Sequence, residues 1–172
     1  CASLGSCRYA KRAHKYEGRR DALRVLSRLA DRSGRLADAN RYAAQANLVD
    51  DEAFPKPFRI SSEEFAAAVE EATNELPDRF RKAAREGNVA ILAEPIPDES
   101  LLIEEEPPFD PSILGLYRGT PLPERSDGDP GEPDTIHLFQ HNLERVSENR
   151  EELVHEIAIT VYHELGHFFG LT

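Results

Sequence analysis

The segment from Arg150 to Phe169 is the longest stretch of the chain with a regular helical pattern. Its apolar side chains recur every three or four residues, which places them on one side of a helix. The residues of this stripe are Leu153, Ile157, Val161, Leu165 and Phe168. A stripe of this kind is buried in folded proteins. The sequence therefore predicts a long helix with one side packed against the rest of its domain.

Three polar residues on this helix form the pattern HExxH: His163, Glu164 and His167. Histidines four residues apart lie on one helix face, so their rings can converge on one ion. Two imidazole nitrogens suit zinc, which activates water, and the adjacent carboxylate can accept the proton of that water. From the composition, about 0.025 matches are expected by chance. We predict His163 and His167 as metal ligands and Glu164 as the catalytic residue; the alternative is that both histidines are ordinary core residues.

Zinc is inferred here from the type of ligand, and Mn²⁺, cobalt, iron or another divalent metal could occupy the same donors. Gly170 extends the motif to HExxHxxG. A glycine at this place can adopt a left-handed conformation, end the helix and turn the chain back. A catalytic zinc ion normally has three protein ligands, and the third is expected three residues after Gly170, beyond Thr172. We therefore expect residues 1–172 on their own to bind metal weakly and to lack activity.

Charge divides the chain into two parts. Residues 1–48 contain 11 Lys and Arg against 4 Asp and Glu, net +7, whereas residues 49–172 contain 10 against 28, net −18. Leucine and alanine recur at helical spacing on both sides of a turn signal at 31–34, which predicts a helical hairpin that resembles one tetratricopeptide unit. This basic segment could bind a protein partner or dock on its own acidic domain. Nucleic-acid binding is not expected, because the basic residues are not clustered with aromatic residues.

Residues 49–60 are predicted to be a linker, because acidic residues and two prolines interrupt any helix there. Residues 61–172 are then expected to form one domain. Nine of the twelve prolines lie between Pro95 and Pro133, which predicts a long loop. The elements expected in this domain are a helix over about 62–74, a second helix opened by Pro77, strands over 88–93 and 135–140, and weaker strands over 101–103 and 113–117.

Four further polar side chains were considered for the site. His137 and His141 are four residues apart, but in a strand this spacing does not bring side chains together, so a surface or supporting role is expected. His155, two turns before His163, is expected to face solvent. Tyr117 is expected in the core, although contact with a reacting carbonyl is an alternative.

Several segments between residues 60 and 172 together resemble the compact bacterial zincin-like metallopeptidases, also called minimal metalloproteases. They are Leu76-Pro77, 88–94, the sequence LGLYRGTPL at 114–122, the strand 136–139 and the sequence TVYHELGHFFGL at 160–171. The resemblance implies an α+β fold in which a small mixed sheet packs on helices. It also implies zinc on His163 and His167, Glu164 as general base, and an aspartate as third ligand directly after Thr172. The N-terminal helices are not required by that core.

The predicted function is that of a zinc-dependent metalloprotease, a hydrolase acting on peptide or protein substrates. The alternative is a non-catalytic, protein-binding adaptor with a helical repeat segment and a vestigial or structural metal site. Two cysteines argue against a disulfide scaffold, and no run of about 18 apolar residues is present to span a membrane. Without an apolar opening segment, the protein is predicted to be cytoplasmic.

Overall fold

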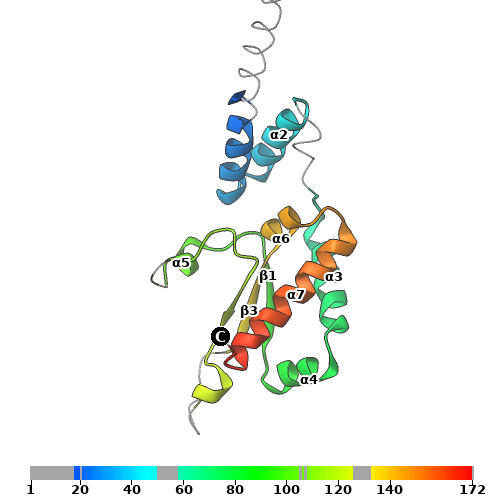
Figure 1. The fold of residues 1–172 in the computed structure, drawn as a ribbon, viewed down its shortest axis with the longest axis vertical. Helices are drawn as coiled ribbons and strands as arrows, with labels where there is room; N and C mark the ends of the chain where they lie inside the picture. Colours follow the sequence, from blue (N-terminus) through cyan, green and yellow to red (C-terminus); the bar gives the residue numbers. More distant parts are fainter. Residues whose placement is uncertain are drawn as a thin grey trace, which may run out of the picture. The chain divides into compact units, whose positions relative to one another are not determined.

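The computed structural model of the chain describes residues 18–19, 21–49, 58–104, 106, 108–125 and 133–171. The chain divides into two compact units, Cys1–Pro57 and Phe58–Thr172. The first contains a helix over 21–32 and helix α2 (Leu36–Asn47) (Figure 1). The turn between them uses Gly34 with a positive φ of 68°, and Ala30, Ala39 and Ala46 are buried. The predicted helical N-terminal segment is confirmed, whereas most of the predicted linker lies outside the described residues.

The second unit contains five helices and three strands among its described residues. The helices are α3 (Ser62–Glu75), α4 (Asp78–Glu86), α5 (Glu99–Leu102), α6 (Gln140–Val146) and α7 (Arg150–Phe168), with a 3-10 turn at η1 (Leu122–Glu124). The strands are β1 (Ala90–Glu94), β2 (Gly115–Arg118) and β3 (Thr135–Phe139). The α+β class, with a small mixed sheet packed on helices, is therefore confirmed.

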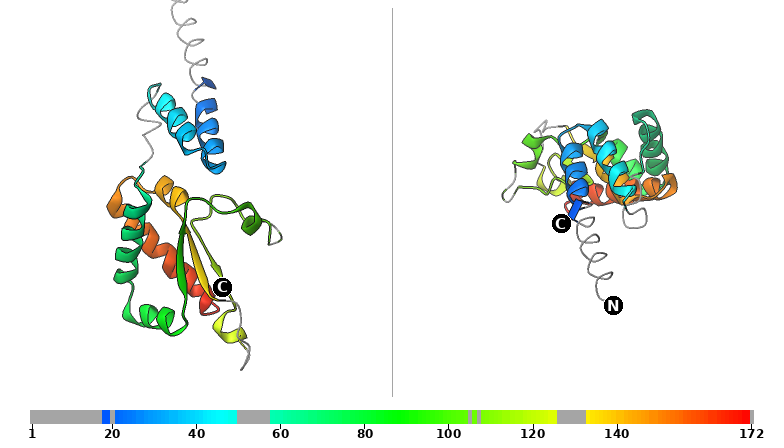
Figure 2. Two further views of the ribbon diagram at one scale, coloured as in Figure 1. Left: turned by 180° about the vertical axis from the view of Figure 1, so that it is seen from behind. Right: turned by 90° about the horizontal axis from the view of Figure 1, so that it is seen from above.

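The sheet has the order β1-β3-β2, so β3 is central. β1 runs parallel to β3, and β2 runs antiparallel to it. Helix α7 crosses one face of this sheet, and α3 packs against α7 (Figures 1 and 2). Ile136 and Leu138 of β3 are fully buried against these helices, together with Phe65 of α3. Since side chains alternate along a strand, His137 points to the opposite face.

The helix boundaries follow from local capping. The Ser61 side chain accepts a hydrogen bond from the Glu64 backbone N–H (3.2 Å), and the Glu64 carboxylate accepts one from the Ser61 N–H (2.8 Å). This capping box fixes the start of α3. Asn149 caps α7 in the same way by accepting from the Glu152 N–H (3.0 Å). The predicted helices over 62–74 and 150–169 are confirmed to within one residue.

Two predictions from the sequence are wrong. Residues 101–103, predicted to be a weak strand, include the end of helix α5. The cause is Asp98, whose carboxylate accepts the Ser100 N–H (2.8 Å) and starts a helical turn. The surface position expected for His137 and His141 is also wrong, because both are buried, His137 on the central strand and His141 at the start of α6. The strands predicted at 88–93, 113–117 and 135–140 exist, shifted by up to two residues.

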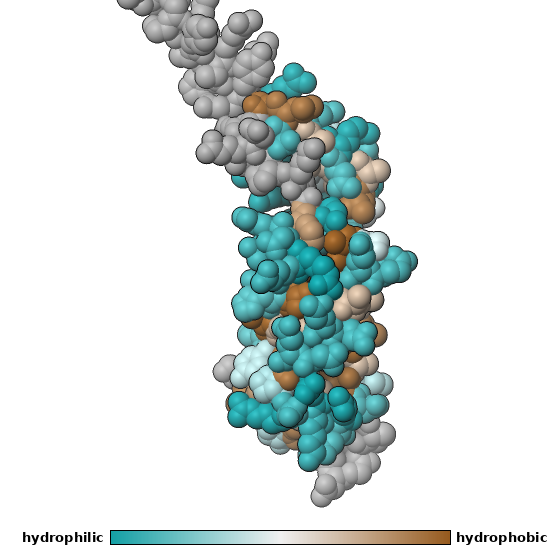
Figure 3. Space-filling view, turned by 90° about the vertical axis from the view of Figure 1, so that its right-hand side faces the viewer, coloured by the Kyte–Doolittle hydropathy of each residue, from teal (hydrophilic) through white to brown (hydrophobic). Residues whose placement is uncertain are grey.

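The described surface is mainly hydrophilic on the face shown in Figure 3. On the face drawn in Figure 3, hydrophilic side chains cover most of the described surface and hydrophobic ones show between them. No helix among the described residues is long and apolar enough to cross a membrane.

Candidate metal centre

His163 and His167 lie one turn apart near the end of α7. Their Nε2 atoms are 3.3 Å apart, and their ring planes are nearly perpendicular, at 89°. His163 is exposed and His167 is half-buried, so neither ring is enclosed in the core. The two nitrogens therefore converge on one point that solvent can reach.

This separation can be compared with the geometry of a zinc ion. For two Zn–N bonds of about 2.05 Å at the tetrahedral angle, the nitrogens are about 3.3 Å apart. The distance between the His163 and His167 Nε2 atoms has the same value. The separation of the two Nε2 atoms thus matches that of two nitrogen ligands on one tetrahedral zinc ion. Within the described ranges, no cluster of three or more His, Cys, Asp or Glu side chains is present to hold a metal.

Glu164 reaches strand β2 from α7. Its side chain is 93% buried, and one carboxylate oxygen accepts a hydrogen bond from the Tyr117 backbone N–H (2.8 Å). Burial raises the pKa of this carboxyl, while the Tyr117 N–H and the two histidines act in the opposite direction. A carboxylate with a raised pKa is a better proton acceptor at neutral pH than an exposed one.

Gly115 allows β2 to lie this close to α7. A Cβ atom at this position would be 2.6 Å from Thr160 Cγ2 and 3.3 Å from Glu164 Cγ. Any other residue would therefore push the strand away from the helix. A glycine within a strand often marks a close approach of the backbone, and this is the signal in the sequence that points to Gly115.

The free edge of β2 lies beside the Glu164 carboxylate. The Phe139 N–H bonds to the Leu114 carbonyl (3.0 Å), so in this antiparallel pair the backbone groups of Leu116 point toward β3. The backbone groups of Gly115 and Tyr117 consequently point outward, and the outward Tyr117 N–H is the one that Glu164 accepts. One side chain of the HExxH motif is therefore bonded to the exposed edge of the sheet.

The sheet and α7 lie within the part of the chain that matches a known protein family. The profile of the zincin-like metallopeptidases matches residues 87–172, which is half of the chain and includes all three strands and α7. The chain belongs to the zincin-like metallopeptidase family. No curated protein matches the chain. Membership in this family supports a peptidase-type enzyme.

A buried cluster around Asp134 holds the far end of β2 in this zincin-like unit. The Asp134 carboxylate accepts hydrogen bonds from the Tyr117 hydroxyl (2.6 Å) and from Arg125 (2.5 Å). Arg125 also donates to the Thr120 carbonyl (2.8 Å). Burial, followed by the bond to Asp134, raises the pKa of the Tyr117 phenol well above its usual range. Tyr117 is half-buried and packs against the core, with its hydroxyl bonded to Asp134.

The segment that follows β2 contacts the end of α7. Gly170, with a φ of 73°, ends the helix as the sequence predicted. A Cβ atom there would be 2.9 Å from Pro123 Cγ of the segment that follows β2. Gly170 therefore provides both the turn and the space for Pro123.

The other histidines that the structure describes are not brought to the pair on α7. His137 Nδ1 lies 3.3 Å from a Glu94 carboxylate oxygen, and its Nε2 lies 3.2 Å from the Thr135 hydroxyl, on the sheet face opposite α7. His141 is buried at the start of α6. His155 is exposed, as predicted.

Proposed function

We propose that the chain is a zinc-dependent metallopeptidase in which His163 and His167 bind the metal and Glu164 is the general base. The observation that supports this most strongly is the 3.3 Å separation of the two Nε2 atoms, with a buried carboxylate on the same helix turn. Membership in the zincin-like family supports the same reaction class. Bound zinc supplies Lewis-acid polarisation of the scissile carbonyl and lowers the pKa of a water molecule.

The protein's own residues account for orientation and proton transfer. Glu164 accepts a proton as the water oxygen forms its bond to the carbonyl carbon, and returns the proton to the amine nitrogen as the C–N bond breaks. The Tyr117 N–H holds one oxygen of the carboxylate, so the other oxygen is left for this transfer. Burial keeps the pKa of Glu164 raised, which favours acceptance of the proton.

The substrate is proposed to be an extended peptide that pairs with the free edge of β2. The outward-pointing carbonyls of Gly115 and Tyr117 and the Gly115 N–H are available for strand addition. A peptide in this position would lie beside Glu164, because that side chain is bonded to the same edge. Pairing with backbone groups recognises an extended chain more than particular side chains, so selectivity would arise from residues flanking β2.

Glu164→Gln is the decisive variant, tested in the natural full-length protein and in residues 1–172. Gln keeps the shape and an acceptor for the Tyr117 N–H but cannot take up the proton. We expect hydrolysis of a peptide library to fall by about 10²-fold or more, with the zinc content, measured by elemental mass spectrometry, unchanged. Glu156→Gln, a change of the same kind two turns earlier on α7, should retain activity.

Two outcomes would contradict the assignment. Cleavage by Glu164→Gln at the rate of the unchanged protein would show that another group carries the proton. A full-length protein that holds zinc at a His163-dependent site but cleaves no peptide would favour the adaptor with a structural metal site. The same elemental analysis distinguishes zinc from manganese, cobalt or iron.

A further inference from the structure

A cavity lies on the side of α7 away from the histidine pair. It has a volume of about 150 Å³ and reaches inward to Ile91 and Ile136 of the sheet and to Val161 and Leu165 of α7. Leu165 is two residues from His163, and hence about 200° around the helix axis from it. The cavity and the candidate metal centre are therefore separate places in one unit.

The lining of this cavity is apolar at its inner end. The lining residues that present accessible apolar surface are Ala84, Val89 and Ile91, which are half-buried, whereas Ile136, Val161 and Leu165 are at most 1% exposed. A cavity of about 150 Å³ admits a molecule as large as benzene. The cavity as a whole therefore has room for an apolar group of about six carbon atoms.

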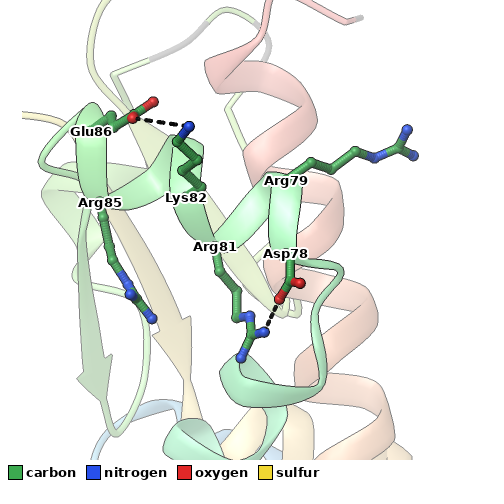
Figure 4. Close-up of a pocket in the computed structure, with 6 residues that line it drawn as sticks. All are labelled: Asp78, Arg79, Arg81, Lys82, Arg85 and Glu86. Carbon is green, nitrogen blue, oxygen red and sulfur yellow. Dashed lines mark hydrogen bonds and ion pairs between the residues drawn. The ribbon is translucent and has the colours of Figure 1, made fainter.

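The mouth of the cavity carries two guanidinium groups from α4, those of Arg81 and Arg85. The two residues are four apart and extend from one side of the helix (Figure 4). Arg81 is already engaged, by an ion pair with Asp78 and a hydrogen bond to the Asn74 carbonyl (3.1 Å). No ion pair or hydrogen bond engages the Arg85 guanidinium among the residues that the structure describes.

Helix α4, which carries Arg85, is rich in basic residues, whereas residues 49–172 as a whole are acidic. Residues 49–172 contain only ten Lys and Arg, and four of them lie within the nine residues of α4. Arg81 and Arg85 also line an open groove of about 480 Å³ along this helix, which places the mouth of the apolar cavity beside a basic surface. A guanidinium binds a carboxylate through two parallel hydrogen bonds. The cavity therefore presents an anion-binding mouth and an apolar interior.

We propose that this cavity is a binding site for a monocarboxylate with a compact apolar group, the carboxylate on Arg85 and the apolar group against Val89 and Ile91. Two sources share this chemistry: a free small carboxylic acid, and the C-terminal carboxylate of a peptide that ends in Leu or Phe. The site is independent of the peptidase assignment, since its lining includes none of His163, Glu164 and His167.

Phenylacetate is the probe that tests the proposal, titrated into the ¹⁵N,¹³C-labelled full chain and followed by NMR. We expect saturable shifts of the Val89 and Ile91 methyl signals, with a dissociation constant on the order of 1 mM for so small a ligand. Acetate lacks the apolar group and phenylacetamide lacks the charge, so both should bind at least about tenfold more weakly. Acetyl-alanyl-phenylalanine tests the peptide source: tighter binding than phenylacetate assigns the site to chain ends, and weaker binding assigns it to free acids.

Arg85→Gln removes the proposed anion contact at an exposed position and leaves the fold in place. It should weaken phenylacetate binding about tenfold. Arg79→Gln makes the same change in charge on the same helix, but Arg79 points elsewhere (Figure 4), so its binding should be unchanged. Absence of saturable methyl shifts up to about 20 mM, equal binding of phenylacetamide, or an equal effect of both variants would overturn the proposal.

Discussion

Replacing Gly115 by alanine tests whether close contact between β2 and α7 holds the Glu164 carboxylate in place. The added Cβ would lie 2.6 Å from Thr160 Cγ2 and 3.1 Å from the His137 carbonyl oxygen. Overpacking of this kind costs about 1 to 3 kcal/mol. For a unit of this size, that corresponds to a fall in melting temperature of roughly 4 to 12 °C.

Thr160→Ser is the matched second change, because it removes only the methyl group that the new Cβ would meet. Serine retains the hydroxyl that donates to the Glu156 carbonyl (2.8 Å). The double variant should recover about half of the lost stability, since the contact with the His137 carbonyl remains. Urea unfolding followed by circular dichroism gives the four free energies of this double-mutant cycle.

Gly166→Ala is a control with the opposite expected sign. At this position on α7 the added Cβ meets no atom closer than 3.8 Å, and alanine favours a helix over glycine by about 1 kcal/mol. This variant should therefore melt at a higher temperature. Unchanged stability of Gly115→Ala, or a double variant no more stable than Gly115→Ala itself, would refute the close-contact reasoning.

Three further predictions concern the polar groups of the site. Burial raises the pKa of Glu164, so the ionised carboxylate destabilises the folded state at neutral pH. This destabilisation disappears as the pH falls below the ordinary pKa near 4.5, because the group is then protonated in both the folded and the unfolded state. Glu164→Gln should therefore melt at a higher temperature than the unchanged protein at pH 7 but not at pH 4. Tyr117→Phe removes the hydrogen bond to Asp134 and should reduce the free energy of unfolding by about 1 to 3 kcal/mol, measured in urea, with Asp134 left to Arg125 alone. His163→Ala should lower zinc affinity by at least about tenfold in a chelator competition, whereas His155→Ala, on an exposed part of the same helix, should not; equal losses would exclude a ligand role for His163.

The parts of the site that sequence could predict are local in the chain. The periodicity of 150–169 fixes α7, and the spacing of His163 and His167 fixes which side chains meet, because both follow from the geometry of one helix. Asn149 and Gly170 mark its ends for the same reason. Whether the two rings bind metal stays a prediction.

The parts that sequence could not predict depend on contacts between distant residues. The hydrogen bond from the Tyr117 N–H to Glu164 joins residues 47 positions apart, and no spacing rule connects them. The burial of His137 follows from the strand order, which places β3 at the centre. The apolar residues at 101–103 fit both a strand and a helix, and the Asp98 cap decided in favour of the helix.

The Tyr117 amide proton offers a way to observe the integrity of this site without metal or substrate. An outward-facing amide on an edge strand normally exchanges rapidly with deuterated solvent, because only water bonds to it. Here a buried carboxylate from another element protects it. The exchange rate of this one proton therefore reports how often strand and helix separate, and a variant that retains overall stability but loses this protection has lost the alignment of its base.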